Sequence, residues 1–161
     1  MNANAQEKQT AAVRIRAANH DDAAALARLC IQLGYDADAD QLRRRLTQID
    51  QDPNHAIFVA QQEGGEIVGF VDLDCRCLAI KDASVEVCGL VIDQSVRGRG
   101  YGQALMQKAE AWAQAIGASA ISLRSNVIRK EAHAFYQRCG YEIYKQQLAF
   151  QKRLVCKSDI D

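Results

Sequence analysis

Apolar and polar residues follow two different periods along this chain, and together they predict an α/β fold. Residues 13–18 (VRIRAA) have strand character, with apolar and polar positions alternating. Residues 56–62, 66–75 and 85–92 are further runs rich in β-branched residues, and the first two are separated by a short Glu-Gly-Gly turn. We therefore expect these runs to form strands, the first two of them as a hairpin.

Helical spacing of apolar residues predicts four helices around these strands. The first follows Asn19, a favourable N-cap residue, and ends at a glycine. The second covers residues 39–49, where leucines lie on one side and arginines on the other. A third helix over residues 103–116 is followed by a glycine and a strand over residues 119–125, and a fourth helix is expected over residues 129–139.

The end of the chain is predicted to return to strand. Residues 141–154 (YEIYKQQLAFQKRL) are expected to form one long or two short final strands. The sequence thus predicts one α/β domain over residues 13–156, with a mixed central sheet of about six or seven strands flanked by about four helices. Residues 1–12 are polar and are expected to form an N-terminal arm outside that domain.

Composition fits one ordinary domain with a sizeable core. The chain has 161 residues, of which 48% are apolar and 25% charged. It has no apolar run long enough to span a membrane, and its first dozen residues lack the apolar segment of a secretory signal. We therefore expect a cytoplasmic protein without a membrane partner.

Charge is balanced overall but unevenly distributed. Residues 1–80 carry 8 basic and 12 acidic side chains, whereas residues 81–161 carry 12 basic and 8 acidic ones. A basic half suits an anionic ligand and an acidic half suits a cationic one, although an imbalance of this size is also common on an ordinary solvated surface. The arginine cluster at residues 43–45 is flanked by acids, so nucleic acid is not an expected partner.

The cysteines predict neither a metal site nor a redox motif, because no CxxC pair is present. We expect them to be buried free thiols in a reducing compartment. They are Cys30, Cys75, Cys77, Cys88, Cys139 and Cys156.

The most informative local feature is a glycine-rich turn, RGRGYG, at residues 97–102. It lies between a predicted strand and a predicted helix, where unpaired backbone N–H groups favour an anion such as phosphate. The glycines allow close approach of the ligand to the backbone. A P-loop would need Lys and Ser/Thr after Gly102, and a dinucleotide fold would need GxGxxG, so the spacing excludes both. By itself, the turn is also compatible with a tight helix start that binds no ligand.

Two segments together resemble the GNAT N-acetyltransferase superfamily. Residues 92–106 (IDQSVRGRGYGQALM) are similar to its acetyl-CoA signature, [RQ]-x-x-G-x-[GA], with a strand before it and a helix after it. Residues 131–141 (EAHAFYQRCGY) are similar to its second signature, in which an alanine precedes an aromatic-Tyr pair and a Gly-aromatic pair. The order of predicted elements also matches beyond the first dozen residues, so the chain is identified as a member with a single GNAT-like domain.

The resemblance implies a binding site for acetyl-CoA as co-substrate. Backbone N–H groups from residues 97–102 would hold the pyrophosphate, with added charge from Arg97 and Arg99, and main-chain groups of the preceding strand would pair with the pantetheine arm. Asn126 either replaces an asparagine that the family often carries where this chain has Arg129, or it caps the following helix. The implied cofactor-binding residues are Leu90, Val91, Ile92, Arg97, Gly98, Arg99, Gly100, Tyr101, Gly102 and Asn126.

The resemblance also implies two catalytic residues. Tyr136 corresponds to the family tyrosine that protonates the leaving thiolate, although its helical position also suits a core residue. Glu86 corresponds to a position where some members carry a general base, and it could instead anchor a cationic substrate or belong to a polar strand pair. Many members use water chains for this proton transfer.

The implied reaction is acetyl transfer from acetyl-CoA directly to a primary amine in a ternary complex, with a small molecule favoured over a protein and with no metal. The alternative is a sensor that binds an acyl-CoA without turning it over. Acids at residues 36, 38 and 40 suit a cationic acceptor, but they equally suit a solvated loop with a helix cap. A homodimer is common in the family, so we regard one as compatible with this chain.

Overall fold

The computed structural model describes residues 13–152 and contains one mixed sheet. Its strands lie in the order β1-β2-β3-β4-β5. The first four strands pair with their neighbours in antiparallel fashion, and β5 pairs with β4 in parallel. The strands are β1 (Val13–Ala17), β2 (His55–Gln62), β3 (Ile67–Leu78), β4 (Lys81–Ile92) and β5 (Ala120–Leu123).

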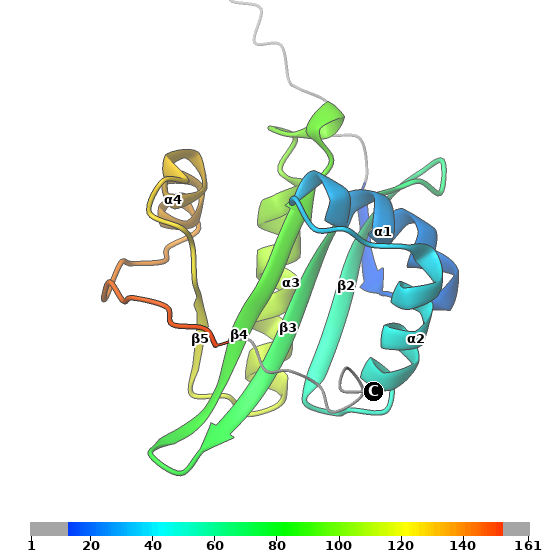
Figure 1. Cartoon of the computed structure of the whole chain (residues 1–161). Helices are drawn as coiled ribbons and strands as arrows, with labels where there is room; N and C mark the ends of the chain where they lie inside the picture. The colour runs from blue at the N-terminus through cyan, green and yellow to red at the C-terminus, as the bar shows by residue number, and fades with distance from the viewer. Residues whose placement is uncertain (1–12, 153–161) are drawn as a thin grey trace, which may run out of the picture. The chain divides into compact units, whose positions relative to one another are not determined.

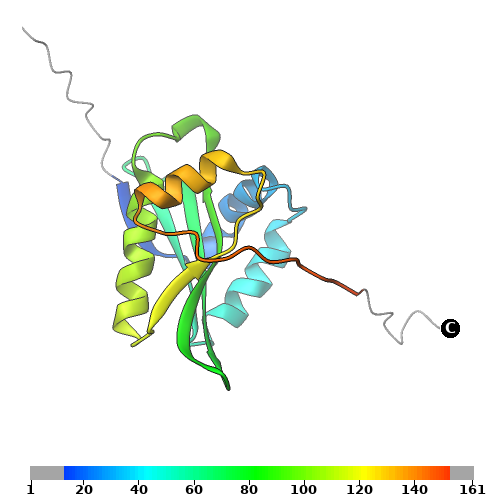
Figure 2. The same ribbon diagram turned by 90° about the vertical axis from the view of Figure 1, so that its left-hand side faces the viewer.

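The helices follow the predicted positions closely and cover both faces of the sheet. Helix α3 lies on one face, and α1 and α2 lie on the other (Figures 1 and 2). Short 3-10 helices precede α1 (His20–Asp22) and α3 (Gln94–Val96). The helices are α1 (Ala23–Gln32), α2 (Ala39–Ile49), α3 (Tyr101–Ala115) and α4 (Lys130–Arg138).

The described residues divide into two compact units. The first extends to Asn126 and contains the whole sheet with α1, α2 and α3. The second begins at Val127 and contains α4. None of the helices within residues 13–152 is long and apolar enough to cross a membrane.

Alternation along the strands divides the apolar side chains between the two faces. Phe58 faces α3, where Lys108 lies over its ring at 5.1 Å. On the opposite face, Val59 and Phe70 pack with leucines of α1 and α2, so each face has its own core. In α3 the buried residues include Leu105 and Ala109, which lie four residues apart on one side of the helix.

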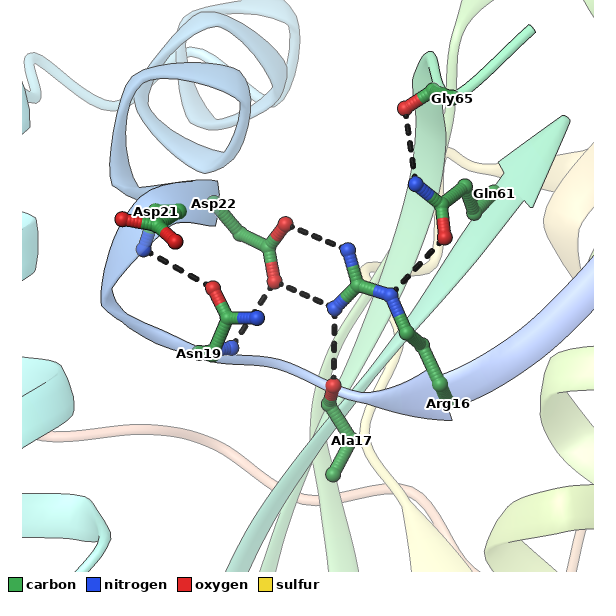
Figure 3. Close-up of polar contacts among 7 residues, drawn as sticks. All are labelled: Arg16, Ala17, Asn19, Asp21, Asp22, Gln61 and Gly65. Carbon is green, nitrogen blue, oxygen red and sulfur yellow. Dashed lines mark hydrogen bonds and ion pairs between the residues drawn. The ribbon is translucent and has the colours of Figure 1, made fainter.

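A partly buried ion pair fixes the start of α1 against β1 and β2. Arg16 donates to both carboxylate oxygens of Asp22, at 2.7 and 2.8 Å, and also to Gln61 at 3.0 Å (Figure 3). Asp22 also accepts from the backbone N–H of Asn19, whose side chain accepts from Asp21 N–H. The predicted Asn19 cap is therefore confirmed, although it caps the short 3-10 helix that leads into α1.

The predicted strand count was too high. The described part of the C-terminal segment, residues 141–152, contains no strand, so the sheet has five strands rather than six or seven. Its alternating apolar side chains bury little surface: Ile143 is 64% exposed and Phe150 is 90% exposed. A strand is stabilised by pairing and by burial of one face, and this segment has neither among the described residues.

Candidate functional site

Strand β4 continues past the end of its neighbour β5 and leaves part of its edge free. The two strands pair only from Ser84 to Val87 on β4, whereas β4 itself continues to Ile92. Residues 88–92 therefore have no strand partner on that side within the described residues (Figure 1). Backbone N–H and C=O groups at a free strand edge can pair with an extended ligand.

A β-bulge marks the point where the free edge begins. Asp72 of β3 is opposite Gly89, and the next residue of β3, Leu73, is opposite Val87. Cys88 is therefore the extra residue on β4. A bulge bends its strand and commonly lies beside a functional site, because it redirects side chains and interrupts pairing.

The free edge leads into the glycine turn, which has the backbone geometry of an anion-binding loop. Gly98 and Gly100 have φ values of 77° and 85°, which L-residues with side chains rarely adopt. A Cβ built on either glycine would meet no atom within 4 Å, so the loop surface is open to an approaching group. Ala104 is the first residue of α3 whose N–H bonds to the preceding turn, which leaves the N–H groups of residues 101–103 directed out of the helix end.

A polar network joins this turn to α1. Asp93 is only 8% exposed and accepts hydrogen bonds from Ser95 N–H at 3.0 Å and from Ser95 Oγ at 2.7 Å. Its other carboxylate oxygen accepts from Arg28 and Gln32 of α1. Bonds from the Ser95 backbone and hydroxyl, followed by the Arg28 bond, hold the pKa of Asp93 far below its ordinary value. The residues entering the turn are thus held by a charged anchor that the sequence motif alone did not indicate.

The predicted cofactor-binding side chains divide into exposed and buried ones. Arg97 is exposed, and its Nε donates to the carbonyl oxygen of Ile92 at 3.1 Å. Arg99 is exposed and has no hydrogen-bond or ion-pair partner within residues 13–152. Tyr101 is 1% exposed, and its hydroxyl accepts from Gln62 at 3.2 Å, so only its backbone can face a ligand.

The strand register places polar residues from four strands in one row across the sheet. Glu86 lies opposite Asp74 on one side and Ser122 on the other, and Asp74 lies opposite His55. Paired residues share a face, and this is the face on which α1 and α2 lie. The register therefore gathers four polar side chains next to the beginning of the free β4 edge.

Glu86 is held by two arginines. Its Oε1 accepts from Arg124 Nε at 2.6 Å and Nη2 at 2.5 Å, and its Oε2 lies 3.8 Å from Arg76 Nη1. Arg76 also donates to Asp74 at 2.5 Å. Glu86 therefore belongs to a polar strand pair, which was one of the alternatives considered from the sequence. The role of Glu86 as a general base stays a prediction.

The described cysteines are more exposed than the sequence predicted, but they are unbridged, as it predicted. The five described cysteines form no disulfide, but none of them is buried: Cys77 and Cys88 are exposed, and the other three are partly exposed. Cys156 lies outside the described residues. Partial desolvation of the Cys88 thiol, followed by the charges of Asp72 and Glu86, raises its pKa to about 11. Little thiolate is present at neutral pH, so Cys88 is a poor candidate for a nucleophile.

Tyr136 belongs to the second unit and lies on α4, as predicted. Its ring contacts Phe135 and Tyr141 edge to face, at centroid distances of 5.2 and 6.2 Å. Burial raises the pKa of Tyr136, and Cys139 adds to this while Arg129 opposes it. The phenol therefore keeps its proton at neutral pH, which a donor to a leaving group requires.

The remaining candidates contribute less to a site. Asp38 accepts from the N–H groups of Asp40 and Gln41 at 2.9 Å and so caps α2, in agreement with the helix-cap alternative. Asn126 is exposed beyond β5, and its proposed cofactor contact stays a prediction.

An open pocket of about 540 Å³ lies beside the Arg16–Asp22 pair, but these charges already neutralise each other there.

Comparison with known protein families agrees with this geometry. Residues 20–141 match the model of the acetyltransferase (GNAT) family. The chain belongs to the GNAT acetyltransferase family. The matched residues include β4, the glycine turn, α3 and Tyr136, so the predicted family membership and enzyme class are confirmed.

Two characterised relatives of this GNAT chain act on small molecules, according to their names. It is 32% identical over 144 residues to aminoglycoside N(6')-acetyltransferase type 1 from Stenotrophomonas maltophilia, covering 87% of this chain and 93% of the relative. It is 31% identical to aminoalkylphosphonate N-acetyltransferase from Salmonella typhimurium, covering 78% and 82% of the two chains.

Solved structures show the same fold. The aminoglycoside N-acetyltransferase AAC(6')-Iy in complex with CoA has a TM-score of 0.78 and 21% identity, covering 89% of this chain and 96% of that one. Glucosamine-6-phosphate N-acetyltransferase from Arabidopsis thaliana has a TM-score of 0.76 and 20% identity, covering 87% and 98%. The α/β GNAT fold of this chain is thereby established.

Proposed function

We propose that this GNAT protein transfers an acetyl group from acetyl-CoA directly to a primary amine of a small, cationic molecule. The observation that supports this most strongly is the continuity of the free β4 edge, residues 88–92, with the open glycine turn at residues 97–102. An extended pantetheine arm fits the free edge, and a pyrophosphate fits the turn with its outward N–H groups. The CoA complex of AAC(6')-Iy supports the same ligand.

The cofactor residues follow from this placement. Main-chain groups of Leu90, Val91 and Ile92 pair with the pantetheine arm, and the backbone from Arg97 to Gly102 holds the pyrophosphate. The exposed guanidinium of Arg99 adds charge that favours phosphate. Asn126 supplies a further pantetheine contact after β5.

The acceptor amine is proposed to lie on the polar row beside the bulge. Asp74 and Glu86 supply carboxylates on that face, and Asp72 lies beside them at the bulge. Anionic groups that are already partly paired still favour an ammonium ligand over an anion. The names of the two characterised relatives, which denote transfer to an aminoglycoside and to an aminoalkylphosphonate, support a small molecule rather than a protein.

Direct transfer is proposed because the described site offers no activated nucleophile. Cys88 lies at the bulge, but its pKa of about 11 keeps it protonated. Tyr136 would then donate its proton to the departing thiolate. A C88S variant should therefore keep its turnover, whereas a loss of turnover with intact CoA affinity would indicate an acyl-enzyme.

The test is an acceptor screen with the purified full chain and acetyl-CoA. Thiol release is measured with an aminoglycoside, an aminoalkylphosphonate, a polyamine and a lysine peptide, and the acetylated product is identified by mass spectrometry. Acetylation of a small-molecule amine is the expected result. Acetylation of the peptide alone would contradict the proposed acceptor class, and CoA binding without thiol release from any amine would contradict catalysis.

A further inference from the structure

A histidine that no sequence motif identified lies on the acceptor face. His55 of β2 contacts Asp72 of β3, with Nε2 and Oδ1 separated by 2.6 Å. The two side chains are 24% and 29% exposed, so the pair is sheltered but accessible to a small molecule. Nδ1 of His55 has no hydrogen-bond partner within residues 13–152.

The pair lies close to the beginning of the free β4 edge, where the acceptor amine is proposed to lie. Asp72 is the ladder partner of Gly89, next to the bulge at which β4 separates from β5. Adjacent strands are about 4.8 Å apart, so Asp72 is one strand away from the free edge and His55 lies one strand further. An ammonium held above Asp72, between His55 and the β4 edge, can reach the imidazole directly or through one water.

His55, held by Asp72, is better arranged to act as a base than Glu86 is. A carboxylate that accepts the N–H of one imidazole nitrogen fixes the tautomer, so the other nitrogen carries the lone pair. In His55 that nitrogen is Nδ1, which is open. The Oε1 of Glu86, in contrast, already accepts from two nitrogens of Arg124.

Charged and titratable groups from α1, α2, β3 and β4 lie in the neighbourhood of His55. Asp72 acts on the pKa of Cys30 from α1 and of Cys88 from β4, which places both thiols in the same neighbourhood, and Arg45 of α2 acts on Cys30. Both thiols have raised pKa values, so they are neutral at pH 7. Besides Asp72, the charged groups that share this face or act on the two neighbouring thiols are Asp74, Glu86, Arg45 and Arg76.

We propose that His55, oriented by Asp72, is the general base that removes a proton from the acceptor ammonium. This inference rests on the proposed function. The ammonium N–H bond breaks, the proton moves to Nδ1 of His55 directly or through one water, and the freed electron pair forms the C–N bond to the acetyl carbonyl carbon while the C=O π pair moves onto the oxygen. The carbonyl then re-forms as the C–S bond breaks, and the sulfur leaves as thiolate and takes a proton from Tyr136. The nitrogen loses its second proton, which replaces the proton that Tyr136 gave up, and His55 returns its proton to water.

The test compares pH profiles of kcat/KM for wild type and His55→Gln, with the amine identified by the acceptor screen. Glutamine keeps a polar group beside Asp72 but cannot take up a proton near neutral pH. A positioned base contributes about 10²–10⁴-fold to rate, so we expect kcat to fall by about 10²-fold while KM for acetyl-CoA is unchanged. One acidic-side ionisation should also disappear from the profile, whereas the ionisation of the amine itself remains in both.

His20→Gln is the matched control. His20 also pairs with an aspartate, Asp50, at 3.3 Å, but it is 46% exposed and lies at the 3-10 turn before α1. Its replacement should leave both kcat and the pH profile unchanged. Asp72→Asn keeps the imidazole and removes its orienting charge, so we expect an intermediate loss of kcat.

The outcomes separate this inference from the proposed function. If wild type acetylates no amine, the proposed function fails and this inference fails with it. If wild type is active and His55→Gln keeps the same profile and kcat, the base assignment alone is overturned. Should His55→Gln unfold, His55→Ala in added imidazole provides a second test, because free imidazole restores turnover only where a base is missing.

Discussion

Replacing Asp93, which anchors the entry to the glycine turn, should lower both the stability of the fold and the affinity for acetyl-CoA, and the two effects can be measured separately. One carboxylate oxygen of Asp93 accepts from Ser95, and the other accepts from Arg28 and Gln32. In Asp93→Asn the carbonyl oxygen can keep the Ser95 bonds. The amide NH₂ then faces the two donors of Arg28 and Gln32, so both of those bonds are lost.

The cost follows from those two bonds. Both bonds are made to the carboxylate, and a hydrogen bond to a charged group contributes about 1.5–3 kcal/mol. Arg28 is 43% exposed, so water recovers part of the loss and a total of about 2–3 kcal/mol is expected. For a domain of this size, each kcal/mol lowers Tm by about 2–4 °C, so Asp93→Asn should unfold about 4–12 °C below wild type.

The pH dependence has a definite sign. The pKa of Asp93 is lower in the folded chain than the ordinary value of 3.8, so the carboxylate contributes stability at every pH above that value. This contribution is lost as the pH falls below 3.8 towards the folded-state pKa. The difference in Tm between wild type and Asp93→Asn should therefore be constant near neutral pH and shrink in acid.

Asp22→Asn is the matched control for the effect on the cofactor. Asp22 is also a buried aspartate paired with an arginine, and there the bonds from Arg16 and the Asn19 N–H outweigh burial and lower its pKa. Both variants should lose stability, but only Asp93→Asn should weaken acetyl-CoA binding in calorimetry, because only Asp93 holds the glycine turn. Equal CoA affinities in the two variants, or an unchanged Tm for Asp93→Asn, would refute this reasoning.

Three further substitutions test the glycine turn, the proposed acid and the packing of β3 against β4, and a fourth, Gly117→Val, is a control. Gly100→Val should abolish CoA binding by filling the open cradle, whereas Gly117→Val, with a similar φ of 75° and equal open space at the other end of α3, should retain it. Tyr136→Phe should lower kcat by about 10²-fold with CoA affinity unchanged. Gly69→Ala should cost about 1–3 kcal/mol of unfolding free energy, because its Cβ would lie 2.7 Å from the backbone carbonyl oxygen of Val91 as well as 2.6 Å from Ile92 Cδ1.

Each of these has a result that would contradict it. CoA affinity preserved in Gly100→Val would remove the phosphate assignment from the turn, and equal losses in both glycine variants would point to backbone strain alone. Full turnover in Tyr136→Phe would return that residue to a packing role. A Gly69→Ala protein as stable as wild type in denaturant titration would mean that β3 and β4 separate at little cost.

Local sequence patterns were sufficient where an element is defined by its own residues. The turn at residues 97–102 was placed between a strand and a helix, and β4 and α3 flank it in the structure. The same patterns did not predict the ends of strands whose side chains are exposed. The β3–β4 hairpin extends to Leu78 and Lys81, beyond the predicted strand ends, because backbone pairing continues although its side chains are exposed. The final strands failed for the opposite reason, since residues 141–152 alternate but have no partner strand within the described chain.

The acceptor face could not be predicted because it depends on register between distant strands. His55 and Asp72 are 17 residues apart, and nothing local to either one indicates that they meet. Their contact requires the pairing of β2 with β3, and their nearness to the free edge requires the bulge at Cys88. Each of these is a long-range property of the folded sheet.

This difference has a consequence for how specificity arises in the family. The proposed cofactor half of the site uses backbone groups of one continuous segment, so it tolerates change in side chains and leaves a short sequence signature. The proposed acceptor half is assembled from single side chains on separate strands, and each of them can change without altering the fold. Relatives of about equal identity to this chain, 32% and 31%, accordingly carry names that denote different amine substrates. The acceptor of this protein should therefore be sought through the polar row and the His55–Asp72 pair rather than through the glycine turn.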